Sequence, residues 1–142
     1  MEFRKPGLLE FEQLLGLLQS FKQSVGEEEI CAAAANRLRT AIQEGKIKFF
    51  VALDNNEFVG MCSISRFFST YTCEPSGIFE DFYILEERRN KGIARGLTDF
   101  AIREMQSEGV TSILAGCTDA DTPMYKSLGF AATLGTLLAC NQ

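Results

Sequence analysis

The sequence predicts an α/β fold in which helices flank a mixed β-sheet. Two stretches with apolar residues at helical spacing come first, a strand-turn-strand pattern follows, and strands then alternate with helices. The expected element order is ααββ followed by βαβαβ. A chain of 142 residues can bury one core but is too short for two ordinary domains, so residues 1–142 are expected to form a single domain.

The first two elements are predicted to be amphipathic helices. Apolar side chains recur at helical spacing across residues 8–21. A second helix is expected to begin after Ser24 or Gly26 and to end at Gly45. Its first turn would contain residues 27–29, three glutamates that suit the positive end of a helix dipole.

A β-hairpin is predicted to follow these helices. Residues 47–53 and 58–68 are rich in β-branched and aromatic side chains, and the polar residues 54–57 between them are typical of a turn. The polar residues 69–76 are expected to form a loop, and residues 78–85 to form another strand.

The second half of the chain alternates between helix and strand. Residues 93–105 carry apolar side chains at helical spacing, and Gly109 is placed to end that helix. Residues 111–117 are typical of a buried strand. A short helix over residues 122–128 and a last, weaker strand from Phe130 onward complete the prediction.

Charge and hydropathy limit the classes of partner. The net charge of −5 argues against a nucleic-acid surface, because affinity for phosphates rests on Lys and Arg, and a cationic substrate suits the chain better. No stretch reaches the roughly 18 apolar residues that a membrane-spanning helix needs, and no secretory leader is recognisable. We therefore expect a cytoplasmic protein with no nucleic-acid or membrane partner.

The residue types present limit the chemistry. The chain contains no histidine, which excludes Ser-His-Asp and Cys-His nucleophiles and histidine-based metal sites. Its five cysteines are scattered and never in C-x-x-C spacing, so neither a disulfide framework nor a zinc site is expected, and no metal is predicted. The general base must be a carboxylate, a tyrosine, a thiol or a water chain.

The strand-loop-helix segment over residues 79–100 contains the main candidate binding site. At its centre, residues 89–94 (Arg-Asn-Lys-Gly-Ile-Ala) follow a strand and open a helix. Backbone N–H groups at a helix N-terminus bind anions, and Gly92 lets the backbone approach a phosphate without a Cβ in the way. Taken alone, these residues also fit an ordinary strand-to-helix connection. They match neither the phosphate loop of ATPases nor the glycine fingerprint of dinucleotide folds.

The same run, Arg-x-x-Gly-x-Ala after a strand, resembles the central motif of the GNAT superfamily of N-acetyltransferases. Residues 125–130 resemble the family's Tyr-x-x-x-Gly-Phe ending, after the expected intervening strand. The resemblance covers residues 47–130, and the two leading helices fit more loosely. It implies a mixed, mostly antiparallel sheet flanked by helices, with room for a short first strand, and acetyl-CoA as the cosubstrate.

The resemblance also implies roles for individual residues. Backbone amides of residues 90–95 would hold the pyrophosphate of CoA, the strand around Phe82 and Ile84 would pair with its pantetheine arm, and Tyr125 would protonate the departing thiolate. The implied cofactor-binding residues are Phe82, Ile84, Arg89, Asn90, Lys91, Gly92, Ile93, Ala94 and Arg95. Thr118 stands where the family often has an asparagine, which leaves a cofactor contact there open.

Two adjacent acids are candidates for the general base. Residues 79–84 resemble a strand of polyamine and other small-amine acetyltransferases in which a glutamate faces the substrate, so Glu80 is the first candidate and Asp81 the second. Because neighbouring strand residues point to opposite faces, only one of them is expected to face the site directly. Glu80 could instead attract a cationic amine, with water as the base.

The function predicted on these grounds is transfer of an acetyl group from acetyl-CoA to a primary amine, by direct attack in a ternary complex. The acceptor could be a small molecule or a peptide, and homodimerisation is expected only at the level of the family. The alternative is a catalytically inactive acyl-CoA-binding regulatory or sensor module of the same fold.

Overall fold

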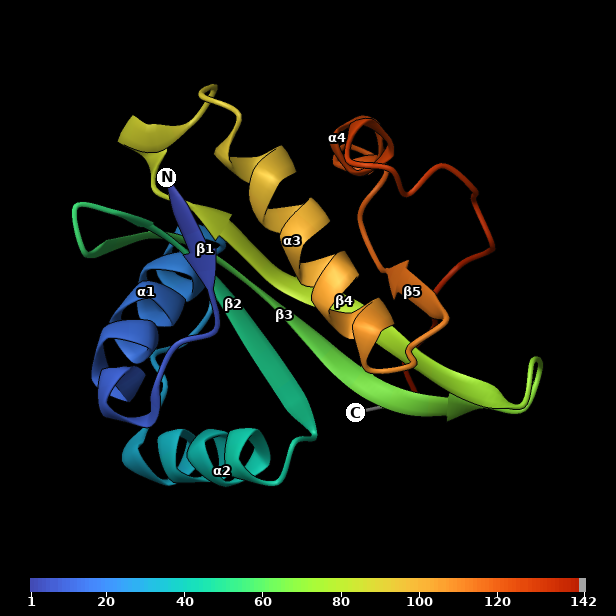
Figure 1. Ribbon diagram of the computed structural model, residues 1–142, viewed down its shortest axis with the longest axis horizontal. Coiled ribbons are helices and arrows are strands. Elements are labelled where there is room, and N and C mark those ends of the chain that lie inside the picture. The colour runs from blue at the N-terminus through green and yellow to red at the C-terminus, as the bar shows by residue number, and fades with distance from the viewer. Residues whose placement is uncertain (141–142) are drawn as a thin grey trace.

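Five strands form one mixed sheet in the order β1-β2-β3-β4-β5 in the computed structural model, which describes residues 1–140 (Figure 1). The strands are β1 (Glu2–Arg4), β2 (Ile47–Asp54), β3 (Glu57–Ser69), β4 (Glu74–Ile84) and β5 (Ser112–Ala115). The first four strands pair antiparallel, and β5 pairs parallel with β4. The predicted mixed, mostly antiparallel sheet with a short first strand is confirmed.

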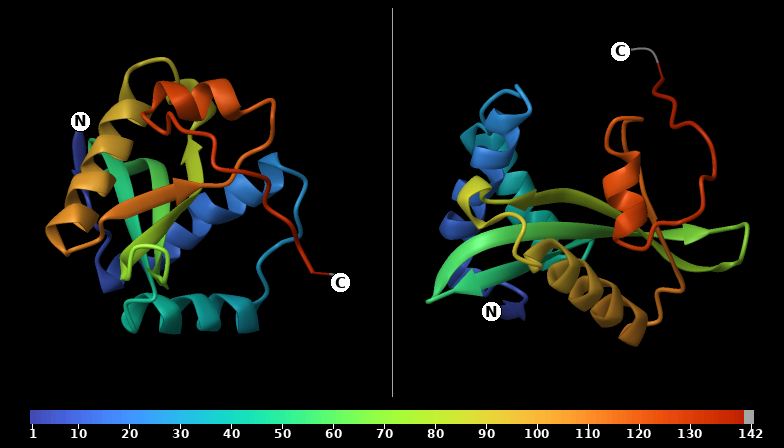
Figure 2. Two further views of the ribbon diagram at one scale, coloured as in Figure 1. Left: turned by 90° about the vertical axis from the view of Figure 1, so that its right-hand side faces the viewer. Right: turned by 90° about the horizontal axis from the view of Figure 1, so that it is seen from above.

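Helices cover both faces of the sheet. Helices α1 (Phe11–Ser24) and α2 (Ala32–Gln43) lie on one face and α3 (Ile93–Ser107) lies on the other (Figure 2). Helix α4 (Thr122–Ser127) follows β5, and short 3-10 helices span Leu8–Glu10 and Glu86–Arg88. Within residues 1–140, no helix has the length and apolar character needed to cross a membrane.

The two faces of the sheet bury separate hydrophobic clusters. Phe50 and Val51, adjacent on β2, are both fully buried, but Phe50 belongs to the cluster under α3 and Val51 to the cluster under α1. Side chains alternate between the two faces of a strand, so a strand covered on both faces needs apolar residues throughout. This explains the nearly continuous apolar run that predicted β2.

Helix α2 starts later than predicted. Its first residue is Ala32, and the N-cap is Cys31, whose Sγ accepts a hydrogen bond from the Ala34 N–H at 3.4 Å. Residues 27–29 are therefore exposed outside the helix, and they do not occupy its first turn. Gly26, with φ of 76°, turns the chain away from the end of α1 and delays the next helix.

The predicted loop over residues 69–76 is shorter than expected, because strand occupies Ser69 and residues 74–76 and only residues 70–73 form the turn. Strand β4 begins at Glu74, and Pro75 pairs opposite Phe68 of β3. Because Pro75 lies near the start of the strand, its missing N–H costs little, and its carbonyl accepts the Thr111 N–H at 3.0 Å. Local composition at residues 74–77 favours a turn, but the tertiary pairing extends the strand.

The predicted last strand from Phe130 onward is wrong for the residues described. Residues 130–140 contain no strand, and the Phe130 N–H instead closes the end of α4 by donating to the Tyr125 carbonyl at 3.1 Å. Leu134, Leu137 and Leu138 beyond it are largely exposed. The apolar composition of this segment suited a strand, but no sheet edge pairs with it.

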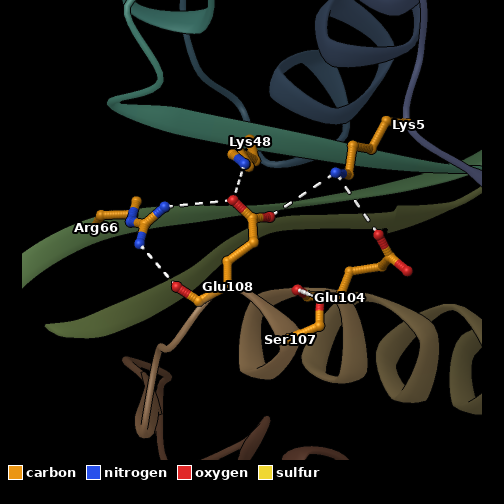
Figure 3. Close-up of polar contacts among 6 residues, drawn as sticks. All are labelled: Lys5, Lys48, Arg66, Glu104, Ser107 and Glu108. Atoms are coloured by element: carbon orange, nitrogen blue, oxygen red, sulfur yellow. Dashed lines mark hydrogen bonds and ion pairs between the residues drawn. The ribbon is translucent and has the colours of Figure 1, made fainter.

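An ionic cluster holds the C-terminal end of α3 to the sheet (Figure 3). The Glu108 carboxylate accepts hydrogen bonds from Lys48 Nζ of β2 and from Arg66 Nη1 of β3, and the latter distance is 3.3 Å. Lys5 Nζ lies 3.8 Å from the other oxygen of Glu108 and 3.6 Å from the Glu104 carboxylate. These cations, led by Lys48, lower the pKa of Glu108.

Candidate active site

The candidate site lies where β4 and β5 separate. The two strands pair in parallel from Ser76 and Ser112 to Phe79 and Ala115, and the pairing ends there. Residues 80–84 of β4 therefore have no strand partner on this edge within the part of the chain that the structure describes. An unpaired strand edge offers backbone N–H and C=O groups to an extended ligand.

A β-bulge interrupts β4 at the start of this open edge. Ser63 of β3 lies opposite Glu80, whereas Met61 lies opposite Tyr83. Between these two pairs β4 has one residue more than β3, which defines the bulge. Asp81 in the bulge has φ of 53°, in the left-handed region.

The bulge decides where the side chains of β4 point. Phe79 and Phe82 are three residues apart and would face opposite sides on a regular strand, yet both pack on the α3 side with ring centroids 5.4 Å apart. Glu80 lies opposite Ser63 and thus on the same face, and Asp81 Oδ2 accepts a hydrogen bond from Ser63 Oγ at 2.6 Å. The expectation that only one acid faces the site assumed the strict alternation of a regular strand, and the bulge interrupts that alternation at these two residues.

The two acids differ in their surroundings. Asp81 is bonded to Ser63, which is fully buried. The Glu80 side chain is solvent-accessible and makes no hydrogen bond or ion pair within residues 1–140. Partial desolvation of the Glu80 carboxylate, and then the charge of Asp81, raise the pKa of Glu80. A raised pKa makes a carboxylate a stronger base, so Glu80 is the better candidate of the two.

Tyr125 of α4 approaches the open edge from the α3 side. Its ring centroid lies 6.4 Å from that of Phe79, 6.3 Å from Phe82 and 5.9 Å from Phe130. Burial, and then nearby acidic groups led by Asp121, raise the pKa of Tyr125 above its ordinary value of about 10. The phenol therefore keeps its proton at neutral pH and can act as an acid.

The loop before α3 presents unpaired backbone N–H groups. Asn90 and Gly92 have φ of 62° and 82°, so the chain turns sharply into the helix. The first helical hydrogen bond runs from the Gly96 N–H to the Gly92 carbonyl, and within residues 1–140 the N–H groups of residues 90–95 have no acceptor. A Cβ at Gly92 would meet open space. Free N–H groups at the positive end of a helix dipole form an anion site.

Two arginine side chains of this segment contact neighbouring elements. Arg89 Nε donates to the Ile84 carbonyl at 2.9 Å, so this predicted cofactor contact is already partly engaged within the chain. Arg95 Nη1 donates to the Ser127 carbonyl at 2.7 Å and joins the first turn of α3 to the end of α4. The contacts of Ser63 and of these arginines were not predicted, because no local motif marks them.

The segment between β5 and α4 is held by its own side chains. Thr118 Oγ1 donates to Asp121 Oδ2 at 3.1 Å, and the Thr118 carbonyl accepts the Thr122 N–H at 3.1 Å. The hydroxyl of Thr118 is thus engaged in building the start of α4. Cys117 is exposed. No group of three or more His, Cys, Asp or Glu side chains among residues 1–140 is arranged to hold a metal ion.

Comparison with known proteins identifies the family. The family model described as Acetyltransferase (GNAT) family matches residues 12–130. The chain belongs to the GNAT family. No curated protein matches the chain by sequence.

Solved structures share the GNAT fold described above. A predicted acetyltransferase from Clostridium acetobutylicum, solved with acetyl-CoA, has a TM-score of 0.83 at 20% identity, covering 99% of this chain and 95% of that one. An aminoglycoside acetyltransferase from an uncultured soil metagenomic sample has a TM-score of 0.86 at 14% identity, covering 99% and 95%. Glucosamine-6-phosphate N-acetyltransferase from Arabidopsis thaliana has a TM-score of 0.77 at 14% identity, covering 99% and 97%.

Acetyl-CoA is the cosubstrate of GNAT enzymes, and the residues present fit it. The free N–H groups of residues 90–95 and the open space over Gly92 suit a pyrophosphate, and the exposed Lys91 adds positive charge. The unpaired edge over residues 80–84 suits the amides of a pantetheine arm. The chain is an acetyl-CoA-dependent acetyltransferase of the GNAT family.

Proposed function

We propose that this protein transfers an acetyl group from acetyl-CoA to a primary amine, by direct attack in a ternary complex. The observation that carries the proposal is the open edge of β4, which includes Glu80 and whose residues Phe79 and Phe82 pack against the ring of Tyr125. Glu80 is an accessible carboxylate with a raised pKa, and Tyr125 is a half-buried phenol that holds its proton. A base and an acid held beside one strand edge suit a reaction that needs one proton removed and another supplied.

Residues 90–95 and the open edge of β4 would bind acetyl-CoA, which supplies an activated acetyl group. The N–H groups of the loop would bind its pyrophosphate, as argued above. Phe82 is the better placed of the two predicted pantetheine contacts, because the Ile84 carbonyl already accepts from Arg89. Ile93 is the first residue of α3 and its side chain is buried in the core, which leaves its backbone N–H as its contribution.

Glu80 would take the proton that the amine must lose. An amine attacks a thioester only in its neutral form, so the acceptor needs a base close to the acetyl group. Glu80 is accessible and free of internal bonds, and its charge also suits an acceptor that arrives as a cation. Asp81, bonded to Ser63, is less free to act as this base.

Tyr125 would donate a proton to the sulfur that leaves. Its ring packs against Phe79 and Phe82 of β4, so its position depends on the same strand that would bind the cofactor. A backbone N–H of the bulged strand would stabilise the negative charge that develops on the acetyl oxygen. The reaction then needs no metal and no covalent acetyl-enzyme.

The acceptor is proposed to be a small amine. Two proteins with this fold are an aminoglycoside acetyltransferase and a glucosamine-6-phosphate N-acetyltransferase, both named for amine-bearing small molecules. The net charge of −5 favours a cationic acceptor over an anionic one. Peptide N-termini and protein lysines are the competing acceptors that the test must include.

The test is a thiol-release screen with acetyl-CoA against polyamines, aminoglycosides, amino sugars, amino acids and peptides, with each product identified by mass spectrometry. We expect release with at least one small amine, a product heavier by one acetyl group, and intersecting initial-velocity lines. Binding of acetyl-CoA without thiol release on any amine would contradict the proposal and indicate an inactive acyl-CoA-binding module instead.

A further inference from the structure

The Ser63–Asp81 pair is a feature that the proposed reaction does not use. Asp81 adopts a left-handed backbone conformation at the bulge, which a non-glycine residue tolerates best when its side chain hydrogen-bonds locally. Ser63 Oγ provides that bond at 2.6 Å. Ser63 is fully buried, so this hydroxyl is not a surface group that could equally bond to bulk water.

The bond joins the two strands at the point where the register changes. Ser63 pairs directly with Glu80, and the extra residue of β4 lies between Glu80 and the next pair, Met61 with Tyr83. Glu80, Asp81 and Ser63 therefore meet at one place on one face of the sheet. A loss of this bond would affect the bulge that sets the direction of Glu80.

Asp81 is also an acidic group close enough to act on both the candidate base and the candidate acid. Its carboxylate acts on Glu80, and it is one of the groups that act on Tyr125. The buried thiol of Cys62, from β3, has its pKa raised by burial and then by Asp81. Cys62 and Tyr125 thus both stay neutral at physiological pH.

Further acidic groups act on Tyr125 from the α4 side. Asp121 is the N-cap residue of α4, and Cys117 lies in the segment before that helix. Asp81 is the acidic neighbour that acts on Glu80.

We propose that Asp81, held by Ser63, is a positioning residue that keeps the bulge in the form that presents Glu80 to the acceptor amine. This inference rests on the role proposed for Glu80. It assigns Asp81 a function other than that of a second base. It also assigns a function to Ser63, a small polar residue within an otherwise apolar strand interior.

The test compares Asp81→Asn, Ser63→Ala and the control Asp119→Asn, an exposed acid in the segment before α4. Asparagine keeps an acceptor for Ser63 and tolerates the left-handed backbone, so Asp81→Asn removes mainly the charge. The first readout is the carboxyl carbon shift of Glu80 in 13C-glutamate-labelled protein, assigned with Glu80→Gln and followed against pH. This readout needs no activity.

We expect the titration midpoint of Glu80 to move to lower pH in Asp81→Asn, because a neighbouring negative charge is removed. Ser63→Ala should move it in the same direction by a smaller amount, because the Asp81 carboxylate is no longer held beside Glu80. Asp119→Asn should leave the midpoint unchanged. In the acetylation assay, the acid limb of kcat/KM should follow the same shifts, and Ser63→Ala should lower kcat by roughly tenfold with KM for acetyl-CoA unchanged.

An unchanged Glu80 midpoint in Asp81→Asn would overturn the inference, whether or not the enzyme acetylates any amine in the screen. Equal loss of affinity for acetyl-CoA in all three variants would also overturn it, since that indicates general disruption. Thermal unfolding of each variant checks the fold. If Asp81→Asn fails to fold, Asp81→Gly provides the same loss of charge on a residue suited to positive φ.

Discussion

The loop over residues 89–95 and the β4 segment over residues 79–84 lie next to each other but are built in different ways. The loop forms its anion site from its own backbone, through positive φ at Asn90 and Gly92 and a helix that starts directly after them. The β4 segment forms its part only through β3, because Ser63 opposite Glu80 defines the bulge. A local motif is enough to recognise the first region, whereas the second depends on pairing between strands.

This difference suggests that the two regions have separate roles in binding and in turnover, which mutations can test. The loop should determine how tightly acetyl-CoA binds, because its N–H groups offer a site for phosphate. The β4 segment, with Tyr125, should determine how fast the acetyl group moves, because its groups transfer protons. Substitutions in one region should therefore affect affinity and those in the other should affect turnover.

The largest effect is expected for Glu80→Gln. Loss of the general base should lower kcat by about a hundredfold to ten-thousandfold, with the Kd for acetyl-CoA within twofold of wild type. Steady-state kinetics and isothermal titration measure the two quantities. In the wild type, kcat/KM should fall as the pH drops through the Glu80 pKa, which desolvation and then Asp81 raise from its ordinary value. Full turnover with weakened acetyl-CoA binding in this variant would show that Glu80 contributes to cofactor binding, as the loop is expected to, and not to proton transfer.

Tyr125→Phe should have a smaller effect on turnover. We expect kcat to fall by about tenfold to a hundredfold, because a thiolate can leave without full protonation while an amine cannot attack without losing its proton. The Tyr125 pKa is raised, so wild-type kcat should hold at least up to the ordinary tyrosine pKa of about 10 and fall above it. Unchanged kcat across the pH range would remove Tyr125 from the mechanism.

Gly92→Val should weaken acetyl-CoA binding by about tenfold or more, since a β-branched residue is strained at φ of 82° and its side chain would enter the open space over the loop. The matched control is Gly45→Val, at φ of 72° and with equally open surroundings, which lies after α2. Both variants should lose similar stability, and only Gly92→Val should lose affinity. Equal affinity in the two variants would show that the loop does not bind the cofactor.

Glu108→Gln should have the smallest effect on activity, because Glu108 lies at the other end of α3. The free energy of unfolding should fall by roughly 2 kcal/mol, since Lys48, Arg66 and Lys5 lose their shared carboxylate. The lowered pKa means that this stabilisation is present above the ordinary glutamate pKa and is lost as the pH falls through the folded value. The free energies of unfolding of wild type and variant, measured with urea, should therefore converge at acid pH. The control Glu44→Gln removes an exposed pair with Lys46 and should change the free energy of unfolding little.

Much of the fold could be predicted from the chain because its patterns are local. The β2–β3 hairpin follows from two apolar strands around a polar turn, and α3 follows from helical spacing that ends at Gly109. The errors occurred where local composition and tertiary pairing disagree. Residues 74–77 have the composition of a turn but join β4, and the apolar residues after Phe130 have the composition of a strand but find no partner.

Local residues alone specify the anion-binding loop, because its N–H groups, its glycine and its helix all lie within a few consecutive positions. Only the tertiary structure decides the arrangement of the two acids. The sequence places Glu80 and Asp81 side by side, and simple alternation would send them to opposite faces. The pairing of β3 with β4 inserts one extra residue, so Ser63 holds Asp81 and leaves Glu80 free beside the open edge. No local pattern encodes that register, because it is set by packing on both faces of the sheet.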